Sequence, residues 1–70
     1  MRRYRIDSSA IRSVGYDEAS RTLELEFEGG AVYDYSGVPP DEALGLLEAD
    51  SRGRYFDDHI RGPYPYRRVA

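Results

Sequence analysis

From Thr22 to Glu28 the chain alternates leucine or phenylalanine with glutamate and has no break in the pattern. Successive side chains of a strand point to opposite faces of a sheet, so a period of two predicts a strand with one apolar and one acidic face. Weaker strand patterns lie on either side, at residues 11–16 and 31–35, with turn residues between them. Together these segments predict a three-stranded antiparallel meander.

A helix is expected directly after the meander. Residues 39–42 are two prolines and two acids, which is typical of a helix start, because proline tolerates the first turn and acids suit the positive end of the helix dipole. This helix should stop near Asp50. Its predicted apolar stripe consists of Ala43, Leu44 and Leu47, with Leu46 beside it.

A second short helix is predicted over residues 52–60. Asp50 or Ser51 can cap its start, and the glycine after it marks its end. Phe56 and Ile60 lie four residues apart on this helix, so they should face the core together.

The last segment contains Pro63 and Pro65, which exclude a helix and predict an extended tail rich in tyrosine and arginine. The predicted class is therefore α+β: a three-stranded antiparallel meander, two short α-helices and an extended Pro/Tyr/Arg tail. Seventy residues make one domain at most, with a core that is barely sufficient. We expect a single domain over residues 1–70, with its core at about 8–69 and a basic N-terminal arm at 1–7.

The face that carries Tyr33 and Tyr35 depends on the turn before them. A two-residue turn at residues 29–30 would place both tyrosines on the face of the glutamates, whereas a three-residue loop that starts at Glu28 would place them in the core. The apolar count favours the longer loop, because the shorter one would point Asp34 inward. Tyrosines on a strand can also stack RNA bases, but glutamates on the same face would repel phosphate.

The composition excludes several kinds of site. The chain has no cysteine, which removes disulfides, thiolate zinc sites and thiol nucleophiles. His59 is the only histidine, so a zinc site is not expected, and no spacing gives it a nucleophile and an orienting acid. Scattered acids such as Glu24 are typical of a solvated face. We therefore predict no catalytic residue, no metal and no cofactor.

The chain is expected to be cytoplasmic and to have no membrane partner. No apolar run approaches the roughly 18–20 residues of a membrane span. The basic start of the chain is not followed by the apolar stretch of a secretory signal. A cysteine-free chain without such a signal is most simply cytosolic.

The net charge of −3 hides a pattern, because all ten basic residues are arginines and most lie near the ends. By count, residues 1–12 carry about +3, residues 13–50 about −9 and residues 51–70 about +3. One interpretation, which the pattern alone favours, is that the ends fold onto the acidic sheet and neutralise it. The other is a basic patch for an anionic partner.

The strongest predicted anion site is residues 51–54, Ser-Arg-Gly-Arg. A helix start offers free backbone N–H groups, and a glycine lets a ligand approach the backbone closely. The alternative is that Gly53 permits close packing between the two helices, with both arginines in solvent.

Several short motifs follow one another along the chain: Ser8-Ser9-Ala10-Ile11, Val14-Gly15-Tyr16-Asp17, Tyr33-Asp34-Tyr35, Gly37-Val38-Pro39, Ser51-Arg52-Gly53-Arg54-Tyr55-Phe56 and His59-Ile60-Arg61. In this order and spacing they resemble the KTSC domain over residues 8–69. That family is named for its occurrence at the C-terminus of some lysyl-tRNA synthetases, and it also occurs as a free-standing bacterial protein, the form that this chain resembles. The resemblance implies an RNA ligand, through the synthetase context alone.

Two functions of different classes follow from the sequence. The first is a small non-enzymatic module that binds RNA (tRNA-like) or phosphate through residues of the second helix and the tail: Arg52, Gly53, Arg54, Tyr55, His59, Arg61, Tyr64, Tyr66, Arg67 and Arg68. The second is a protein-interaction module that uses exposed aromatic residues or an unpaired edge strand and binds no nucleic acid. Tyr33, Tyr35, Phe56 and Ile60 are assigned to the structure, and the oligomeric state is left open.

Overall fold

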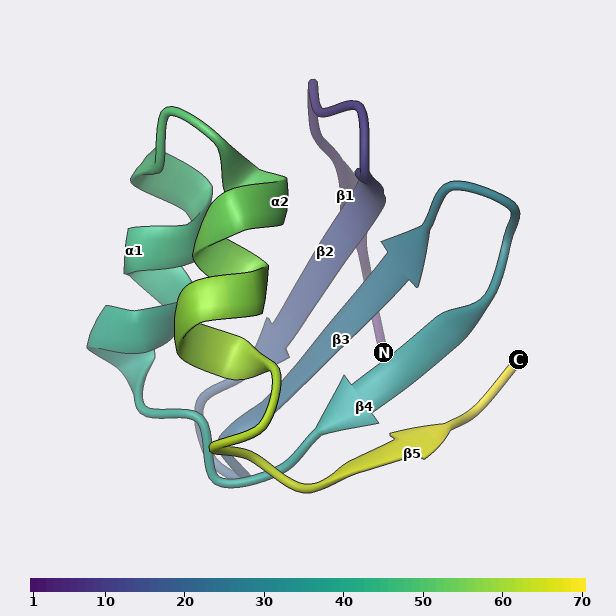
Figure 1. Ribbon diagram of the computed structural model, residues 1–70. Coiled ribbons are helices and arrows are strands. Elements are labelled where there is room, and N and C mark those ends of the chain that lie inside the picture. Colours follow the sequence, from purple (N-terminus) through teal and green to yellow (C-terminus); the bar gives the residue numbers. More distant parts are fainter.

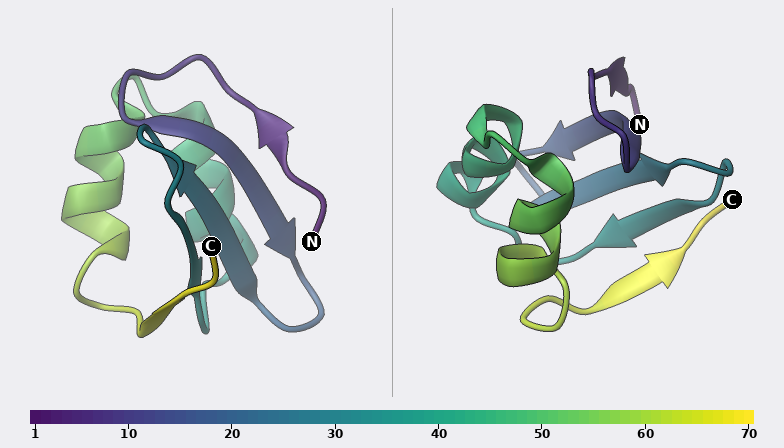
Figure 2. Two further views of the ribbon diagram at one scale, coloured as in Figure 1. Left: turned by 90° about the vertical axis from the view of Figure 1, so that its right-hand side faces the viewer. Right: turned by 45° about the horizontal axis from the view of Figure 1, so that its top comes forward.

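The computed structural model describes all 70 residues. Its elements in chain order are β1 (Tyr4–Arg5), β2 (Ile11–Asp17), β3 (Thr22–Phe27), β4 (Val32–Tyr35), α1 (Pro40–Glu48), α2 (Arg52–Tyr55), the π-helical turn η1 (Phe56–Ile60) and β5 (Tyr66–Arg68) (Figure 1). The strands form one antiparallel sheet in the order β1-β2-β3-β4-β5. The helices cover one face of this sheet (Figure 2). No helix has the length and apolar character that crossing a membrane would need.

The sheet has five strands, so the prediction of three was wrong in this detail. The meander of β2, β3 and β4 is present, but β1 and β5 add a strand at each edge. Strand β5 comes from the predicted extended tail: the amide of Ser36 donates to the carbonyl of Pro65 (2.9 Å), and that of Val69 donates to Val32 (2.8 Å). An extended tail beside the open edge of β4 satisfies backbone groups of both segments by pairing. The sequence of this strand has no alternation of apolar and polar residues that would predict it.

Strand β4 pairs with β3 in the register of the three-residue loop, as the apolar count favoured. Tyr35 lies opposite Leu23, and the amide of Phe27 donates to the carbonyl of Ala31 (2.9 Å). The loop glycines at 29–30 have φ angles of 100° and 97°, which favour glycine strongly. The tyrosines of β4 therefore share the helix-covered face with the leucines of β3.

The apolar stripe predicted for α1 was partly wrong. Ala43 and Leu46 are buried, whereas Leu44 is 53% exposed and Leu47 is 40% exposed. Three leucines within four positions span more than one face of a helix, so spacing alone does not decide which face packs. Val38, which is completely buried just before the helix, fixes how the chain enters it. On the following helix, Phe56 and Ile60 are buried as predicted.

The segments α2 and η1 are continuous, and we call them helix two. Their packing against α1 depends on Gly45, because a Cβ there would lie 2.8 Å from Cζ of Tyr55. Gly53 permits close packing as well, but its neighbour is Ala10, to which a Cβ would come within 3.1 Å. The alternative that Gly53 permits close packing between the two helices was therefore wrong about the partner: Gly53 packs on Ala10, and Gly45 is the glycine between the helices.

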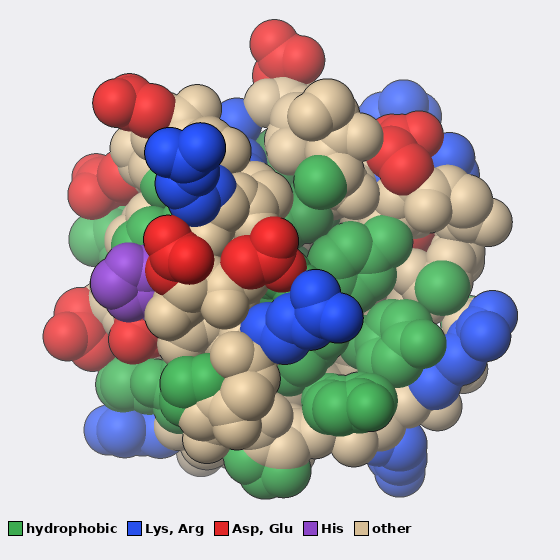
Figure 3. Space-filling model, in the orientation of Figure 1, with side chains coloured by type: hydrophobic (Ala, Val, Ile, Leu, Met, Phe, Trp, Pro, Cys, Tyr) green, Lys and Arg blue, Asp and Glu red, His purple; other side chains and the backbone are tan.

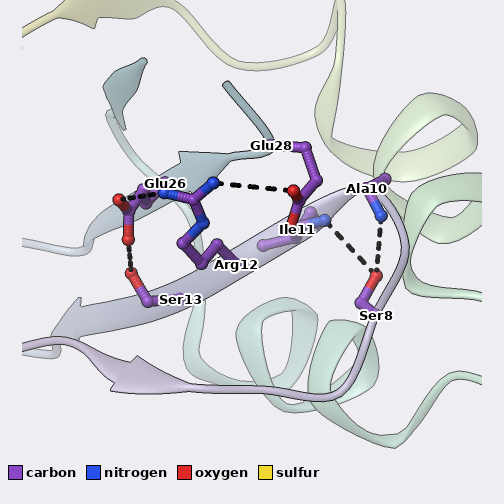
Figure 4. A network of polar contacts seen from close by, with 7 residues as sticks. All are labelled: Ser8, Ala10, Ile11, Arg12, Ser13, Glu26 and Glu28. Carbon is purple, nitrogen blue, oxygen red and sulfur yellow. Dashed lines mark hydrogen bonds and ion pairs between the residues drawn. The ribbon is translucent and has the colours of Figure 1, made fainter. Parts of the chain in front are cut away.

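The basic strands near the two ends of the chain, β1 and β5, lie at opposite edges of the sheet, with β2, β3 and β4 between them (Figure 1). They do not form one patch. Instead, each end contacts acids of the central strands, through Arg3–Glu24 (2.6 Å), Arg12–Glu26 (3.5 Å), Arg12–Glu28 (3.5 Å) and Arg67–Asp34 (3.9 Å). Figure 4 shows Arg12 between its two glutamates, beside the hydrogen bond from Ser13 to Glu26 (2.8 Å). Arg3, Arg12 and Arg67 therefore pair with acids of the sheet, as the first interpretation of the charge pattern expects, whereas Arg61 pairs with Asp57 within helix two.

Candidate functional site

An open pocket lies where the end of helix two and the turn after it meet β4 and β5. We call it the aromatic pocket, and it is lined by Phe27, Tyr33, Tyr35, Phe56, Arg61, Gly62 and Tyr66. Figure 3 shows hydrophobic side chains gathered beside a basic side chain on this face. The cavity of about 230 Å³ exceeds the roughly 150 Å³ that admits benzene in an engineered protein core. It therefore has room for one planar ring system.

The walls of the aromatic pocket come from three parts of the fold. Alternation along β4 turns Tyr33 and Tyr35 to the same face, and the register of β5 sets Tyr66 directly opposite Tyr35. The ring centroid of Tyr66 lies 5.6 Å from that of Tyr33 and 5.8 Å from that of Tyr35. Phe27 and Phe56 close the inner side at 5.1 Å in an edge-on arrangement. These distances are typical of packed aromatic pairs, so the rings form one continuous wall.

The tyrosine hydroxyls of the pocket differ from those that hold segments of the fold together. Three tyrosine hydroxyls donate hydrogen bonds within the chain, those of Tyr16, Tyr55 and Tyr64. Those of Tyr33, Tyr35 and Tyr66 have no partner in the protein. Tyr35 as a whole is only 5% exposed, but its hydroxyl oxygen reaches solvent at the pocket, because the one buried side-chain oxygen without a partner is Oδ1 of Asp34. Burial, with the neighbouring Tyr33 and Tyr66, raises the pKa of Tyr35 to about 12. Its hydroxyl therefore keeps its proton at neutral pH and can donate to a ligand.

Arg61 is the only charged residue among the pocket walls. Its Nη1 lies 3.4 Å from Oδ1 of Asp57, four residues earlier, and both side chains are mostly exposed. Exposed ion pairs of this spacing are worth only a few tenths of a kcal/mol. The guanidinium can therefore leave Asp57 for a ligand at little cost.

On another side of helix two, Glu42 of α1 contacts three side chains. The hydroxyl of Tyr55 donates to its Oε1 and that of Tyr64 to its Oε2 (3.4 Å). Nδ1 of His59 lies 3.6 Å from Oε1, and its ring stacks on that of Tyr55 with centroids 4.1 Å apart. This cluster, which we call the Glu42 cluster, ties α1, helix two and the start of the tail together.

Comparison with known proteins identifies the fold. Residues 7–64 match the family model of the KTSC domain.

The chain belongs to the KTSC domain family.

This confirms the resemblance seen in the sequence. A crystal structure of a KTSC domain protein from Yersinia pestis is 40% identical, with a TM-score of 0.92 over 99% of this chain and 97% of that one. An uncharacterised protein of Stutzerimonas stutzeri is 48% identical over 96% of this chain and 93% of its own length. A lysine–tRNA ligase of Nostoc punctiforme is 33% identical over 91% of this chain, which spans only 11% of the ligase.

In this KTSC domain the predicted anion site at residues 51–54 uses its first arginine internally. Nη1 of Arg52 donates to the carbonyl of Asp7 (2.6 Å), and its Nη2 donates to that of Leu47 at the end of α1 (2.9 Å). The polar hollow beside it is also lined by Asp7 and Asp50, whose carboxylates oppose an anion. The guanidinium thus holds the backbone of two other segments.

The remaining predicted ligand residues are divided among several surfaces. Arg54 is exposed on helix two, and Arg67 faces Asp34 on the side of the sheet away from the helices. Arg68 pairs with Tyr33, so its side chain shares the face of the aromatic pocket. Tyr55, His59 and Tyr64 belong to the Glu42 cluster. In the wall of the aromatic pocket the structure brings together two of the predicted residues, Arg61 and Tyr66. Arg68 lies on the same face of the sheet, and its Nε donates to the carbonyl of Ala70 (2.9 Å).

Sequence reasoning missed a carboxyl pair on the outer face of the sheet. Glu24 was expected in solvent, but it is 6% exposed, and it lies opposite Asp34 in the register of β3 and β4. Burial and the adjacent Glu24 raise the pKa of Asp34, whose Oδ1 is buried without a hydrogen-bond partner. Burial opposes ionisation of Glu24 too, but contacts with Asp34 and Arg3 lower its pKa. One shared proton satisfies such a pair. Neither pocket of the molecule adjoins it.

Alkaline pH is expected to destabilise the domain. The pKa of Tyr35 and that of Tyr55 are raised from 10.0 to about 12 in the folded protein, by burial for the first and by the hydrogen bond to Glu42 for the second. Because the folded pKa lies above the unfolded one, the stabilisation is complete below about pH 10 and is lost between about pH 10 and about pH 12. Urea unfolding followed by circular dichroism across this range measures it.

Glu42→Gln provides the control for this prediction. It should lower the pKa of Tyr55 toward 10.0, because the carboxylate is the first cause of the raised value, and should leave that of Tyr35 at about 12. Tyrosinate absorbance, assigned with Tyr55→Phe and Tyr35→Phe, follows each group. An unfolding free energy that stays constant to about pH 12 contradicts the prediction.

Proposed function

We propose that this KTSC domain is a small non-enzymatic binding module that takes one base of single-stranded RNA into the aromatic pocket, with Arg61 and Arg68 beside the phosphates. The observation that carries the proposal is the set of five aromatic rings around one arginine in a cavity of about 230 Å³. Stacking of a base on aromatic side chains is worth about 1–3 kcal/mol and accepts any base, because every base has a π face.

The arrangement of charge around the pocket also supports this function. The glutamates of β3 lie on the opposite face of the sheet from Tyr33 and Tyr35, because Leu25 and Leu23 face those tyrosines across the strands. The repulsion of phosphate that one register would have caused is therefore absent. A cytosolic location, expected from the cysteine-free composition, agrees with an RNA ligand.

The relatives supply a context for the same proposal. Proteins named as lysine–tRNA ligases contain a region similar to this chain, which spans 11% of their length. That name associates the domain with an RNA-dependent enzyme, but it assigns no residue. The argument for the site therefore rests on the pocket.

A titration with a five-nucleotide single-stranded RNA at low salt tests the proposal. Amide shifts in the NMR spectrum are expected in β4, β5 and the turn after helix two. Affinity should fall as salt rises, because phosphate contacts release counterions. Shifts confined to other surfaces, or none at all, would overturn the proposal. Salt-insensitive binding of a protein partner at the pocket, with no RNA binding, would favour the protein-interaction function instead.

A matched pair of tyrosines makes this test specific. Tyr66 in the pocket is 66% exposed and Tyr4 at the opposite edge of the sheet is 61% exposed. Tyr66→Ala is expected to weaken RNA binding by about fivefold to a hundredfold, the cost of one lost stacking contact. Tyr4→Ala should leave the affinity unchanged. Equal effects of the two substitutions would exclude the pocket as the binding site.

Strand addition at β5, the edge-strand form of the protein-interaction function, has less support. The strand has three residues, two of them arginines, and Pro65 precedes it. Short length, positive charge and proline are the features by which natural proteins prevent pairing at a sheet edge. A partner is therefore expected at the rings of the pocket and not at the backbone of β5.

A further inference from the structure

The two arginines of the proposed site lie at opposite ends of the aromatic pocket. Arg61 follows helix two and forms an isolated bridge with Tyr64, just before β5 begins. Arg68 is the last residue of β5, beside the C-terminus (Figure 1). An extended chain rises about 3.3 Å per residue, so the backbone at Tyr64 is about 13 Å from that at Arg68. Tyr66, with Tyr35 opposite it, lies between these two points.

Both guanidiniums are available to an anion on the pocket side of the sheet. Nη1 of Arg61 pairs with Asp57 at 3.4 Å, and the Arg61 side chain is 72% exposed. Nε of Arg68 donates to the carbonyl of Ala70 (2.9 Å), and its two Nη groups have no partner in the protein. Arg67, the residue before it, faces the other side of the sheet. The pocket side therefore carries one arginine at each end of a row of rings.

This placement of charge fits a ligand with an anionic group on each side of one ring system. The cavity of about 230 Å³ has room for one base. An internal nucleotide of an RNA chain presents a phosphate on both sides of its nucleoside, whereas a terminal nucleotide or a free monophosphate presents one on a single side. Contacts with phosphate carry no sequence information. The arrangement therefore concerns the position of a nucleotide in a chain and not the identity of its base.

We infer that the aromatic pocket takes a nucleoside with phosphate on both its 5′ and its 3′ side, and that Arg61 and Arg68 each contact one of the two phosphates. The inference rests on the proposed binding of a base in the pocket and names its smallest ligand, a nucleoside 3′,5′-bisphosphate. Within RNA this unit is an internal nucleotide, and it also exists as a free nucleotide. The experiment treats the two sources separately.

Four adenosine compounds test the inference by NMR titration at one low salt concentration without divalent metal: the 3′,5′-bisphosphate, the 5′-monophosphate, the 3′-monophosphate and the 5′-triphosphate. The bisphosphate is expected to bind about threefold to fivefold more tightly than either monophosphate, because it gains one exposed ion pair. The triphosphate carries a similar total charge on one side of the nucleoside, so it should bind more weakly than the bisphosphate. A five-nucleotide adenosine RNA represents the chain.

Arginine-to-glutamine variants locate the two contacts. Arg61→Gln and Arg68→Gln should each remove the advantage of the bisphosphate over the monophosphates. The double variant should weaken the bisphosphate by about ninefold to twenty-five-fold, because two separate contacts are lost. It should weaken a monophosphate by only about threefold to fivefold, because one phosphate meets one arginine at a time. Arg67→Gln, on the opposite face of β5, is the matched control and should change no affinity. Circular dichroism confirms that each variant is folded.

The outcomes separate the inference from the proposed function. Equal binding of the bisphosphate and the triphosphate overturns the inference, because total charge and not its placement then decides. Equal losses of bisphosphate and monophosphate in the double variant overturn it as well, since both arginines then serve one phosphate. In either case, RNA binding that is weakened in Tyr66→Ala leaves the proposed function standing. Binding of the bisphosphate without the RNA supports the arrangement of phosphates and overturns the function. If neither binds, both fall.

Discussion

Replacing Leu46 by alanine is expected to lower the free energy of unfolding by about 2–5 kcal/mol, whereas replacing Leu44 by alanine should lower it by about 0.5 kcal/mol or less. The two leucines lie two positions apart on α1. Leu46 is completely buried against the sheet, and Leu44 is 53% exposed. Truncation of Leu46 leaves a cavity in the core. Truncation of Leu44 removes only contacts at the surface of the helix, where water replaces the side chain.

Urea unfolding followed by circular dichroism measures both variants under the same conditions. A 70-residue domain has a total stability of roughly 4–10 kcal/mol, so the Leu46 variant is partly unfolded at room temperature when the stability of the parent protein lies at the lower end of this range. Addition of moderate sucrose or sulfate restores enough folded protein to keep the comparison quantitative. Equal losses for the two substitutions would contradict the packing of α1, as would a larger loss for Leu44.

This pair of leucines also shows a feature that the sequence alone did not predict, namely which face of α1 packs against the sheet. The alternation at residues 22–28 left no choice about β3, because a shift by one residue would have exposed every leucine. The leucines of α1 occupy adjacent faces of a short helix, and its orientation depends on what it packs against. That partner, the face of a sheet with Tyr16 and Tyr35, is distant in sequence and has no local signal.

The candidate site was predictable only in part, because it also depends on a contact between segments that are distant in sequence. Tyr66 and Arg61 were among the expected ligand residues, because exposed aromatics and arginines suit a binding surface. Tyr33 and Tyr35 were assigned to the core, and the structure places them in the wall of a pocket as well. The pocket exists only because β5 returns to pair with β4, a contact between residues more than thirty positions apart. The Glu42 cluster depends on a similar long-range contact.

The effect of Gly45→Ala on the free energy of unfolding is expected to change sign when Tyr55 is also replaced by alanine. In an ordinary helix, alanine in place of an interior glycine stabilises by about 1 kcal/mol. Here the new Cβ would lie 2.8 Å from Cζ of Tyr55. The phenol must therefore move and lose its hydrogen bond to the Glu42 carboxylate, an interaction worth about 1.5–3 kcal/mol. The expected net result of Gly45→Ala is a loss of about 1–2 kcal/mol.

The same substitution in a Tyr55→Ala background is expected to stabilise the domain by about 1 kcal/mol, because the clash is gone and only the helix preference remains. The coupling energy between the two positions is then about 2–3 kcal/mol, obtained from urea unfolding of the four proteins in a double-mutant cycle. The pKa of Tyr55 in the single Gly45→Ala variant should also fall from about 12 toward 10.0, since its raised value depends first on the hydrogen bond to Glu42. A Gly45→Ala effect of the same sign and size in both backgrounds would mean that Tyr55 does not pack on Gly45, and that the two helices meet through other residues.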